Sequence, residues 1–340
     1  MNNFIPKKID YKQYVVDSQL RYFKPHATKI EKSFAEEISY SLNQNSKFIN
    51  PKFFYDKKGS DLFESICLLP EYYPTRTEIS ILKNLEHDLL SYLDKNINLV
   101  ELGSGASVKT RLILDIFTKL QNKTEYFPID ISEILTESSE QLLKDYDTLH
   151  ITGIIDTYEG ALEFLKTYDD KKNLILFLGS SFGNFTPNDG KLFLEKIFST
   201  MKSGDLFLIG LDLVKDKNIL EAAYDDSQGI TAKFNLNVLS RINDELDADF
   251  DIKNFSHYSI YNESDQRIEM NLKSLVTQSV IIGKSNLSLN LEKDELIHTE
   301  YSHKYNLSQI KELLSTVGFE IKNIWLDEKK FFSLTLLTKN

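Results

Sequence analysis

The sequence is poor in cysteine, proline and glycine, with one, seven and thirteen of these residues among 340. A single thiol, Cys67, cannot form an internal disulfide framework or a zinc site with several cysteine ligands. It lies in an apolar run, ICLLP, where a thiol usually packs in a core. Because glycine and proline are scarce, the few places where glycines cluster stand out as candidate turns.

Positive charge and long hydrophobic runs are also scarce. The chain has 40 Lys+Arg against 51 Asp+Glu, a formal net charge of −11. Such an acidic chain is not typical of proteins that bind nucleic acids or anionic membranes. No apolar run approaches the roughly 18 residues of a membrane span, and the first residues lack the hydrophobic region of a signal peptide. We therefore expect a cytoplasmic monomer that acts on a small molecule and binds neither nucleic acid nor membrane.

The middle of the chain alternates between short apolar segments and amphipathic segments. This alternation predicts parallel strands joined by right-handed helical crossovers, which together form a doubly wound α/β sheet. From 213 the pattern changes to a helical stretch, 217–245, followed by segments with period-2 alternation, which predict an antiparallel region. The predicted strands of the two parts are 97–102, 126–131, 150–155, 174–178 and 205–212, and then 255–262, 267–272, 276–282 and 296–302.

The length leaves room for two domains at roughly 150 residues each. A predicted helix at 307–317 and a strand pair after it return the chain to the large sheet. The N-terminal part predicts little beyond a helix near 35–43 and another over 76–92. We expect a Rossmann-like domain and a smaller α+β substrate-binding domain, formed by residues 77–212 plus 303–340 and by residues 1–76 plus 213–302.

A glycine turn, Glu101–Gly105, follows the first predicted strand of the sheet and leads into a helix. Glycine permits a sharp turn and close approach of a ligand to the backbone, and the helix N-terminus offers free N–H groups. The pattern is E-x-G-x-G, and Val108 stands where a dinucleotide site would have its third glycine. Asp130 ends the next strand, where an acidic residue can accept from ribose hydroxyls. We therefore favour S-adenosylmethionine (SAM) over a nicotinamide dinucleotide, and over a turn that binds nothing.

Several longer motifs in the sequence resemble one family. The most specific is FYDKKGSDLFESICLLPEYYPTRTE at 54–78. Together these motifs resemble the histidine-specific, SAM-dependent methyltransferases, best known for trimethylating the α-amine of L-histidine to hercynine in ergothioneine biosynthesis. Further matches are ELGSGASVKTR at 101–111, FLGSSFGNFTP at 177–187, AYDDSQGITAKFNLNVLSRIN at 223–243, RIEMNL at 267–272 and IHTEYSHKY at 297–305.

The resemblance implies a role for individual residues, with Lys109 on the methionine carboxylate of SAM, Thr157 and Tyr158 near adenine, and Glu300 with Ser302 on the imidazole. The implied cofactor contacts are Gly103, Ser104, Gly105, Lys109, Asp130, Thr157 and Tyr158. The implied substrate contacts are Tyr73, Asn184, Tyr224, Met270, Glu300 and Ser302. The implied catalytic residues are Tyr55, Tyr73 and Asn184. The chain departs from the family at Lys293–Glu295, which lacks a glycine often seen there, and at Phe182, where smaller aliphatic residues are common.

The chemistry of methyl transfer suits these residues. A sulfonium already carries a good leaving group, so the protein must mainly align amine, methyl and sulfur. The amine must also be free of its extra proton, and the first transfer could use a tyrosine, a water or an amine that is already neutral. Glu300 and Ser302 are two apart in a predicted strand and so share a face, where a carboxylate and a hydroxyl could bind both ring nitrogens. Tyr55, Tyr72 and Tyr73 could surround a quaternary ammonium, although one of the last two is expected in the core.

Other functions remain possible from the sequence. A relative acting on another amino acid, such as a tryptophan derivative, would need an apolar pocket in place of Glu300 and Ser302. A SAM-binding protein without turnover, or a nicotinamide dehydrogenase, fits the motifs less well. The pair Glu300 and Ser302 could also simply face solvent on an edge strand. A metal site at His298, Glu300 and His303 is disfavoured, because His303 is expected to point away from the other two.

Overall fold

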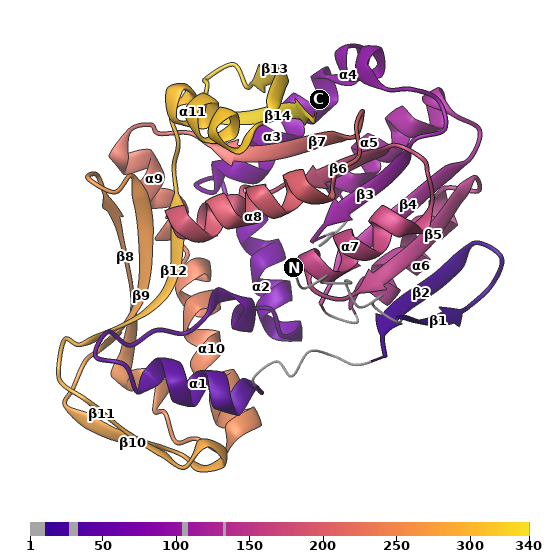
Figure 1. Cartoon of the computed structure of the whole chain (residues 1–340). Coiled ribbons are helices and arrows are strands. Elements are labelled where there is room, and N and C mark those ends of the chain that lie inside the picture. The colour runs from indigo at the N-terminus through magenta and orange to yellow at the C-terminus, as the bar shows by residue number, and fades with distance from the viewer. Residues whose placement is uncertain (1–10, 27–32, 104–107, 132–133, 340) are drawn as a thin grey trace, which may run out of the picture.

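The computed structural model describes residues 11–26, 33–103, 108–131 and 134–339, and its largest element is a nine-stranded sheet (Figure 1). The strand order is β1-β2-β5-β4-β3-β6-β7-β14-β13. The strands from β2 to β7 pair in parallel, whereas β14 pairs antiparallel with both β7 and β13. The predicted doubly wound sheet is therefore confirmed. The five central strands are β3 (Asn98–Leu102), β4 (Thr124–Asp130), β5 (Leu149–Ile155), β6 (Asn173–Phe177) and β7 (Leu206–Asp212), and the C-terminal pair is β13 (Glu320–Leu326) and β14 (Phe332–Thr338).

Helices cover both faces of this sheet. Buried side chains of α3, α4, α5 and α6 pack on one face and those of α7, α8 and α11 on the other. Because both faces are covered, β3, β6 and β7 are buried along their whole length, and this is why β6 and β7 read as nearly continuous apolar runs in the sequence. The bounds are α3 (Tyr73–Asn84), α4 (Glu86–Tyr92), α5 (Val108–Leu120), α6 (Ile134–Asp145), α7 (Tyr158–Tyr168), α8 (Pro187–Thr200) and α11 (Leu307–Val317).

The N-terminal hairpin corrects the expected division of the chain. Its strands β1 (Tyr11–Val15) and β2 (Leu20–Pro25) extend the large sheet, since β2 pairs in parallel with β5. Residues 11–25 were expected in the smaller domain with the rest of 1–76. The hairpin gave little periodic signal because β1 is a largely exposed edge strand, so its side chains are not sorted into apolar and polar faces.

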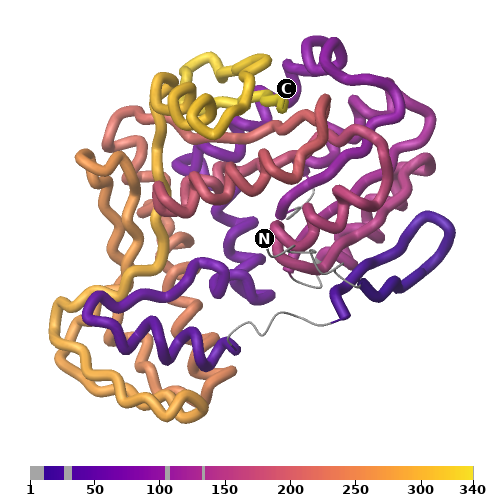
Figure 2. Tube along the Cα trace, viewed as in Figure 1, coloured from indigo at the N-terminus to yellow at the C-terminus, as the bar shows by residue number. Residues whose placement is uncertain are grey.

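A second hydrophobic core lies beside the large sheet and joins 38–73 to 220–297. Figure 2 shows these two distant stretches of chain side by side. The expected helix over 217–245 is two helices separated by Asp225–Gly229, and one strand, β11, was not predicted. The elements are α1 (Phe34–Leu42), α2 (Lys57–Cys67), α9 (Lys217–Tyr224), α10 (Ile230–Leu246), the sheet β12-β9-β8 (Leu296–His303, Arg267–Ser274 and Phe255–Asn262), the hairpin β10 (Gln278–Ile282) and β11 (Leu287–Leu291), and the short helices η1 (Pro51–Phe54), η3 (Ile252–Asn254) and η4 (Gly283–Ser285).

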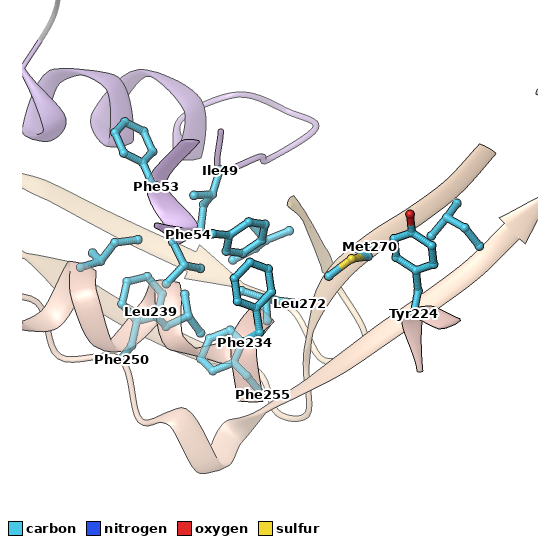
Figure 3. Packing of buried hydrophobic residues seen from close by; sticks show 14 of the residues in the cluster. Ile49, Phe53, Phe54, Tyr224, Phe234, Leu239, Phe250, Phe255, Met270 and Leu272 are labelled. Carbon is cyan, nitrogen blue, oxygen red and sulfur yellow. The ribbon is translucent and has the colours of Figure 1, made fainter. Parts of the chain in front are cut away.

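Aromatic side chains fill this second core. Phe54 and Phe234 lie 4.6 Å apart between ring centroids, and Met270 and Tyr224 lie at one end of the same cluster (Figure 3). That end faces the large sheet. The short helix η2 (Ser181–Asn184), which follows β6, approaches β12 so closely that a Cβ on Gly183 would lie 2.8 Å from the backbone oxygen of His303. Glycine at this position therefore lets the two cores meet.

No helix in the described ranges has both the length and the apolar character needed to cross a lipid bilayer.

Candidate active site

The turn after β3 is shaped for close approach to the backbone. Gly103 has a φ of +72°, in the left-handed region that favours glycine, and a Cβ added there would lie 2.8 Å from the hydroxyl oxygen of Tyr158. A side chain at this position would therefore collide with Tyr158, and only glycine fits. Ser104 and Gly105, which were also expected to contact the cofactor, lie outside the described residues.

Glu101, the first residue of the glycine motif, holds the turn in place from inside the core. It is 3% exposed and accepts hydrogen bonds from the hydroxyls of Thr110 at 2.8 Å and Tyr126 at 2.6 Å. Burial raises the pKa of its carboxyl to about 7, although both hydroxyls oppose the shift. Glu101 thereby connects β3 to α5 and β4. Sequence reasoning quoted this residue in the motif without giving it a role.

Lys109, in the first turn of α5, lies between the ends of β3 and β6. Its ammonium forms an ion pair of 2.7 Å with Glu78, which is fully buried and also accepts from the backbone N–H of Gly179 at 2.9 Å. The strand order reverses between β3 and β6, and doubly wound sheets bind ligands at such a position. An ammonium has three donor hydrogens, so Lys109 can hold Glu78 and a ligand carboxylate together. Glu78 belongs to the TRTE end of the longest motif, and sequence reasoning overlooked it.

Asp130 and Tyr158 flank the same turn. Asp130 is the last residue of β4 and Tyr158 the first of α7. Burial and then the negative charge of Asp130 raise the pKa of Tyr158, so the two side chains are electrostatic neighbours. The hydroxyl of Thr157 caps α7 by accepting from the N–H of Gly160 at 3.2 Å. The side chain of Thr157 therefore acts as the N-cap of α7.

An open cavity of about 580 Å³ lies next to this region, between the two cores. It begins at Gly179–Ser181, which follows β6, and extends toward β12. Six of the side chains expected to act on the substrate line it, and they come from three helices or loops and two strands. They are Tyr55, Asn184, Tyr224, Met270, Glu300 and Ser302.

Tyr73 is placed differently from the expectation. The described residues that line the cavity include Tyr72 and not Tyr73. Tyr73 is 1% exposed, donates to Asp212 at 2.6 Å and accepts from Lys215 at 2.7 Å. The structure thus places Tyr72 in the cavity wall, and the pocket role expected for Tyr73 stays a prediction. The two tyrosines are adjacent at the start of α3, where neighbouring side chains point in different directions, and the sequence alone did not show which one faces the cavity.

Glu300 is held inside the cavity wall. It lies opposite Met270 across β12 and β9, just after a bulge between His298 and Glu300 that re-aims the following side chains. Its carboxylate is 8% exposed and accepts from the side-chain amide of Asn184 at 3.3 Å. Burial raises its pKa to about 7, and the positive charge of Lys304 limits the rise.

Ser302 and Tyr224 form a hydroxyl pair beside Glu300. Their oxygens lie 2.8 Å apart, and the ammonium of Lys304 donates to Ser302 at 2.8 Å and to Tyr224 at 3.0 Å. Lys304 is fully buried and also pairs with Asp212 at 2.8 Å. Asp212 in turn pairs with Lys215 at 2.6 Å. Sequence reasoning missed Lys304, Asp212 and Lys215, although Lys304 stands in the quoted IHTEYSHKY motif.

Aromatic rings form the rest of the wall. Tyr72 meets Tyr224 with ring centroids 6.1 Å apart, and Tyr55 packs against Phe63 and Phe234 at 5.7 and 5.9 Å. Burial raises the pKa of Tyr72 well above its ordinary value, so its hydroxyl stays protonated at neutral pH. Across the described ranges, no group of three or more His, Cys, Asp or Glu side chains is arranged to hold a metal ion.

The chain was compared with known proteins. Residues 34–339 match the family described as histidine-specific methyltransferase, SAM-dependent. The chain belongs to this family. The histidine N-alpha-methyltransferase of Mycobacterium tuberculosis (strain CDC 1551 / Oshkosh) is 37% identical over 304 residues, which cover 89% of this chain and 94% of that protein. The enzyme of the same name from Mycolicibacterium smegmatis is 35% identical over 314 residues, covering 92% and 97%. A 4-dimethylallyltryptophan N-methyltransferase of Claviceps purpurea is 25% identical over 321 residues, covering 88% and 93%.

Membership of the histidine-specific, SAM-dependent methyltransferases makes SAM the methyl donor, and the described residues fit it. Gly103 has no Cβ, so the backbone of the turn can approach its neighbours as closely as it approaches Tyr158. Lys109 offers a cation for the carboxylate of the methionine part, and Asp130 ends the strand beside the turn, where it can accept from ribose hydroxyls. The cavity that contains Glu300 begins at Gly179. The N–H of Gly179 donates to Glu78, the same carboxylate that pairs with Lys109. The cofactor site and the substrate cavity therefore adjoin.

Proposed function

We propose that this protein transfers methyl groups from SAM to the α-amine of L-histidine and repeats the transfer to the trimethylated product, hercynine. The observation that carries the proposal is the position of Glu300 and Ser302 in the wall of one cavity, with Asn184 next to Glu300. A buried carboxylate and a hydroxyl match the two nitrogens of an imidazole ring. An amino acid without ring nitrogens would give neither group a partner on the substrate, and a site of this kind rejects such ligands strongly.

The amino-acid end of histidine would lie toward β6. Asn184 follows this strand at the carboxyl edge of the sheet, where ligands of doubly wound folds bind. Its amide already holds Glu300, so one side chain connects the ring end of the cavity with the end near the methyl donor. We assign Asn184 and Tyr224 to the substrate's amino-acid group and Met270 to the wall behind the ring.

When bound, SAM supplies a methyl group on a sulfonium, which needs no covalent intermediate on the protein. The residues of this chain hold the amine in line with that group, and alignment of this kind contributes several orders of magnitude in rate. The amine must be unprotonated at each transfer. Tyr55 and Tyr72 line the cavity as neutral phenols, which can orient the amine, and their rings suit the positive charge that a trimethylated product carries permanently.

The test is to incubate the purified protein with SAM and a mixture of the common amino acids, and to read the masses of the products. Addition of up to three methyl groups to histidine alone is the expected result. Methylation of tryptophan or another amino acid instead would overturn the substrate assignment while leaving the cofactor. Bound SAM with no methylated amino acid would mean that the protein binds SAM without turnover.

We further propose that the protein acts as a cytoplasmic monomer. Sedimentation analysis with histidine and S-adenosylhomocysteine present should give a mass near 39.4 kDa.

A further inference from the structure

The buried ammonium of Lys304 uses all of its donor hydrogens on three oxygens. These belong to Asp212, Ser302 and Tyr224, at 2.8, 2.8 and 3.0 Å. The side chains of Lys304 and Asp212 are both completely buried. Lys304 cannot accept a hydrogen bond, so Ser302 and Tyr224 must each accept one from it. One lone pair on each cavity hydroxyl is therefore occupied before any substrate binds.

The remaining bond between the two hydroxyls leaves only two arrangements. If Tyr224 donates to Ser302, both lone pairs of Ser302 are occupied, and Ser302 can only donate its own hydrogen to a ligand. If Ser302 donates to Tyr224, Ser302 can only accept from a ligand. The first arrangement matches an imidazole nitrogen without a proton. The second matches a ring N–H, which requires an imidazolium when Glu300 binds the other N–H.

The charges around Ser302 decide between these arrangements. Two ammoniums, Lys304 and Lys215, share the single carboxylate of Asp212, so the cluster behind Ser302 is positive. An imidazolium N–H on Ser302 would approach the Lys304 ammonium, which lies 2.8 Å behind the same oxygen. Repulsion between like charges is strong in buried surroundings. A neutral ring avoids this repulsion.

From this geometry we propose that Lys304 is a positioning residue that selects the neutral form of the histidine ring. It does so by making Ser302 a hydrogen-bond donor, while Glu300 accepts from the single ring N–H. The inference rests on the proposed function and adds to it which protonation state of the substrate the cavity takes. It also assigns a task to a lysine that lies behind the cavity wall and does not line it.

Several other titratable groups surround Lys304 and have to be separated from the ring itself. Glu300, whose pKa burial raises to about 7, and His303, whose pKa burial lowers, are the two that bear on mildly acidic conditions. The groups that face Lys304 are Asp212 of β7 with Lys215 after it, Tyr73 of α3, Tyr224 of α9, Tyr261 of β8, Glu300 and His303 of β12, and Tyr305.

The experiment compares the dissociation constants of L-histidine and 2-fluoro-L-histidine by calorimetry in the presence of S-adenosylhomocysteine. Fluorine lowers the basicity of the ring so far that this analogue stays neutral throughout the range used. Because both ligands meet the same protein, titration of Glu300 or His303 affects both alike and cancels in the ratio. A histidine ring has an ordinary pKa of about 6.5, so the ratio of the two constants should rise about tenfold between about pH 7.5 and about pH 5.5.

Two variants identify the residue responsible. In Lys304→Met the cation is gone and a lone pair of Ser302 is released, so the ratio should change less than about threefold over the same range. Lys215→Met removes an ammonium from the same buried carboxylate without touching either cavity hydroxyl, and it should keep the tenfold change. An equal loss of the pH dependence in both variants would mean that Lys304 acts only by supporting the fold.

The wild-type protein tests the proposal even if Lys304→Met does not fold. Binding of histidine as the neutral ring at about pH 5.5 must release close to one proton more per ligand than binding of 2-fluoro-L-histidine does, because most of the free histidine is protonated there. Calorimetry in two buffers with different ionisation enthalpies measures this release. Binding without this additional proton release and with a pH-independent ratio would overturn the inference while leaving the proposed function. Failure to bind histidine even at about pH 7.5 would instead refute the proposed function.

Discussion

The cofactor end and the substrate end of the site are built in different ways. The turn at Gly103, Lys109 and Asp130 lies within about thirty residues of sequence and depends on backbone shape. The substrate cavity collects single side chains from loops, helices and strands as far apart as Tyr55 and Ser302. The cofactor end is therefore formed by the large sheet alone, whereas the substrate end forms only when both hydrophobic cores are assembled. It follows that each end can be altered with little effect on the other.

The largest effect is expected from Glu300→Ala. Without the carboxylate, a ring N–H enters the buried wall without a partner, and kcat/KM for histidine should fall by about a thousandfold. The dissociation constant of SAM should change less than about twofold, because Glu300 lies outside the turn at Gly103. Glu269→Ala, on the neighbouring strand and outside the cavity, is the matched control. Equal losses of histidine and SAM binding would show that Glu300 supports the whole fold and that the two ends are not separable.

The converse change is Lys109→Met. Loss of the cation should weaken SAM binding by about ten- to a hundredfold, since a charged hydrogen bond to the methionine carboxylate is removed and Glu78 is left buried without its partner. Calorimetry with SAM measures this, with Lys119→Met on the exposed part of the same helix as the control. Wild-type affinity for SAM would remove Lys109 from the cofactor site.

A smaller effect separates the two adjacent tyrosines. Tyr73→Phe should lower the free energy of unfolding by about 2 kcal/mol, because Asp212 and Lys215 each lose a buried hydrogen bond. Tyr72→Phe should leave stability nearly unchanged and raise the KM for histidine about threefold to tenfold. Denaturant titrations and initial rates measure the two quantities. The reverse outcome, with KM altered only in Tyr73→Phe, would restore the sequence-based assignment.

Much of the fold was predictable because it is recorded in local patterns. The nearly continuous apolar runs of β6 and β7 exist because both faces of the sheet are covered. The exposed edge strand β1 of the N-terminal hairpin carries no such pattern, and the place of the hairpin beside β5 is set by long-range pairing. Periodicity of this kind shows that a strand exists and does not show which strand it will pair with.

The candidate site shows the same limit. Family motifs pointed to Glu300 and Ser302, and their spacing in a strand explains how both can face one cavity. Lys304 stands two residues further on in the same motif, yet lysine is usually an exposed residue. Only the approach of Asp212, from a strand more than eighty residues earlier, makes its burial possible. The residues behind the wall of a site depend on contacts of this kind between distant parts of the chain, and no local sequence pattern predicts them.

The last effect concerns the packing behind the cofactor turn and depends on pH. Burial raises the pKa of Glu101 to about 7, above the ordinary value of about 4.3. The folded protein therefore holds this proton more tightly than the unfolded chain does. The stability that results is fully present below about pH 4 and is lost as the pH rises through about 7. In Glu101→Gln the side chain is neutral at every pH, so the variant should gain about 2.5 kcal/mol relative to wild type between about pH 5 and about pH 8. Urea titrations at the two pH values measure the difference, and Glu312→Gln on the exposed face of α11 should show no such trend. A gap that stays constant with pH would mean that Glu101 is ionised in the fold throughout, and that the hydroxyls of Thr110 and Tyr126 fully offset its burial.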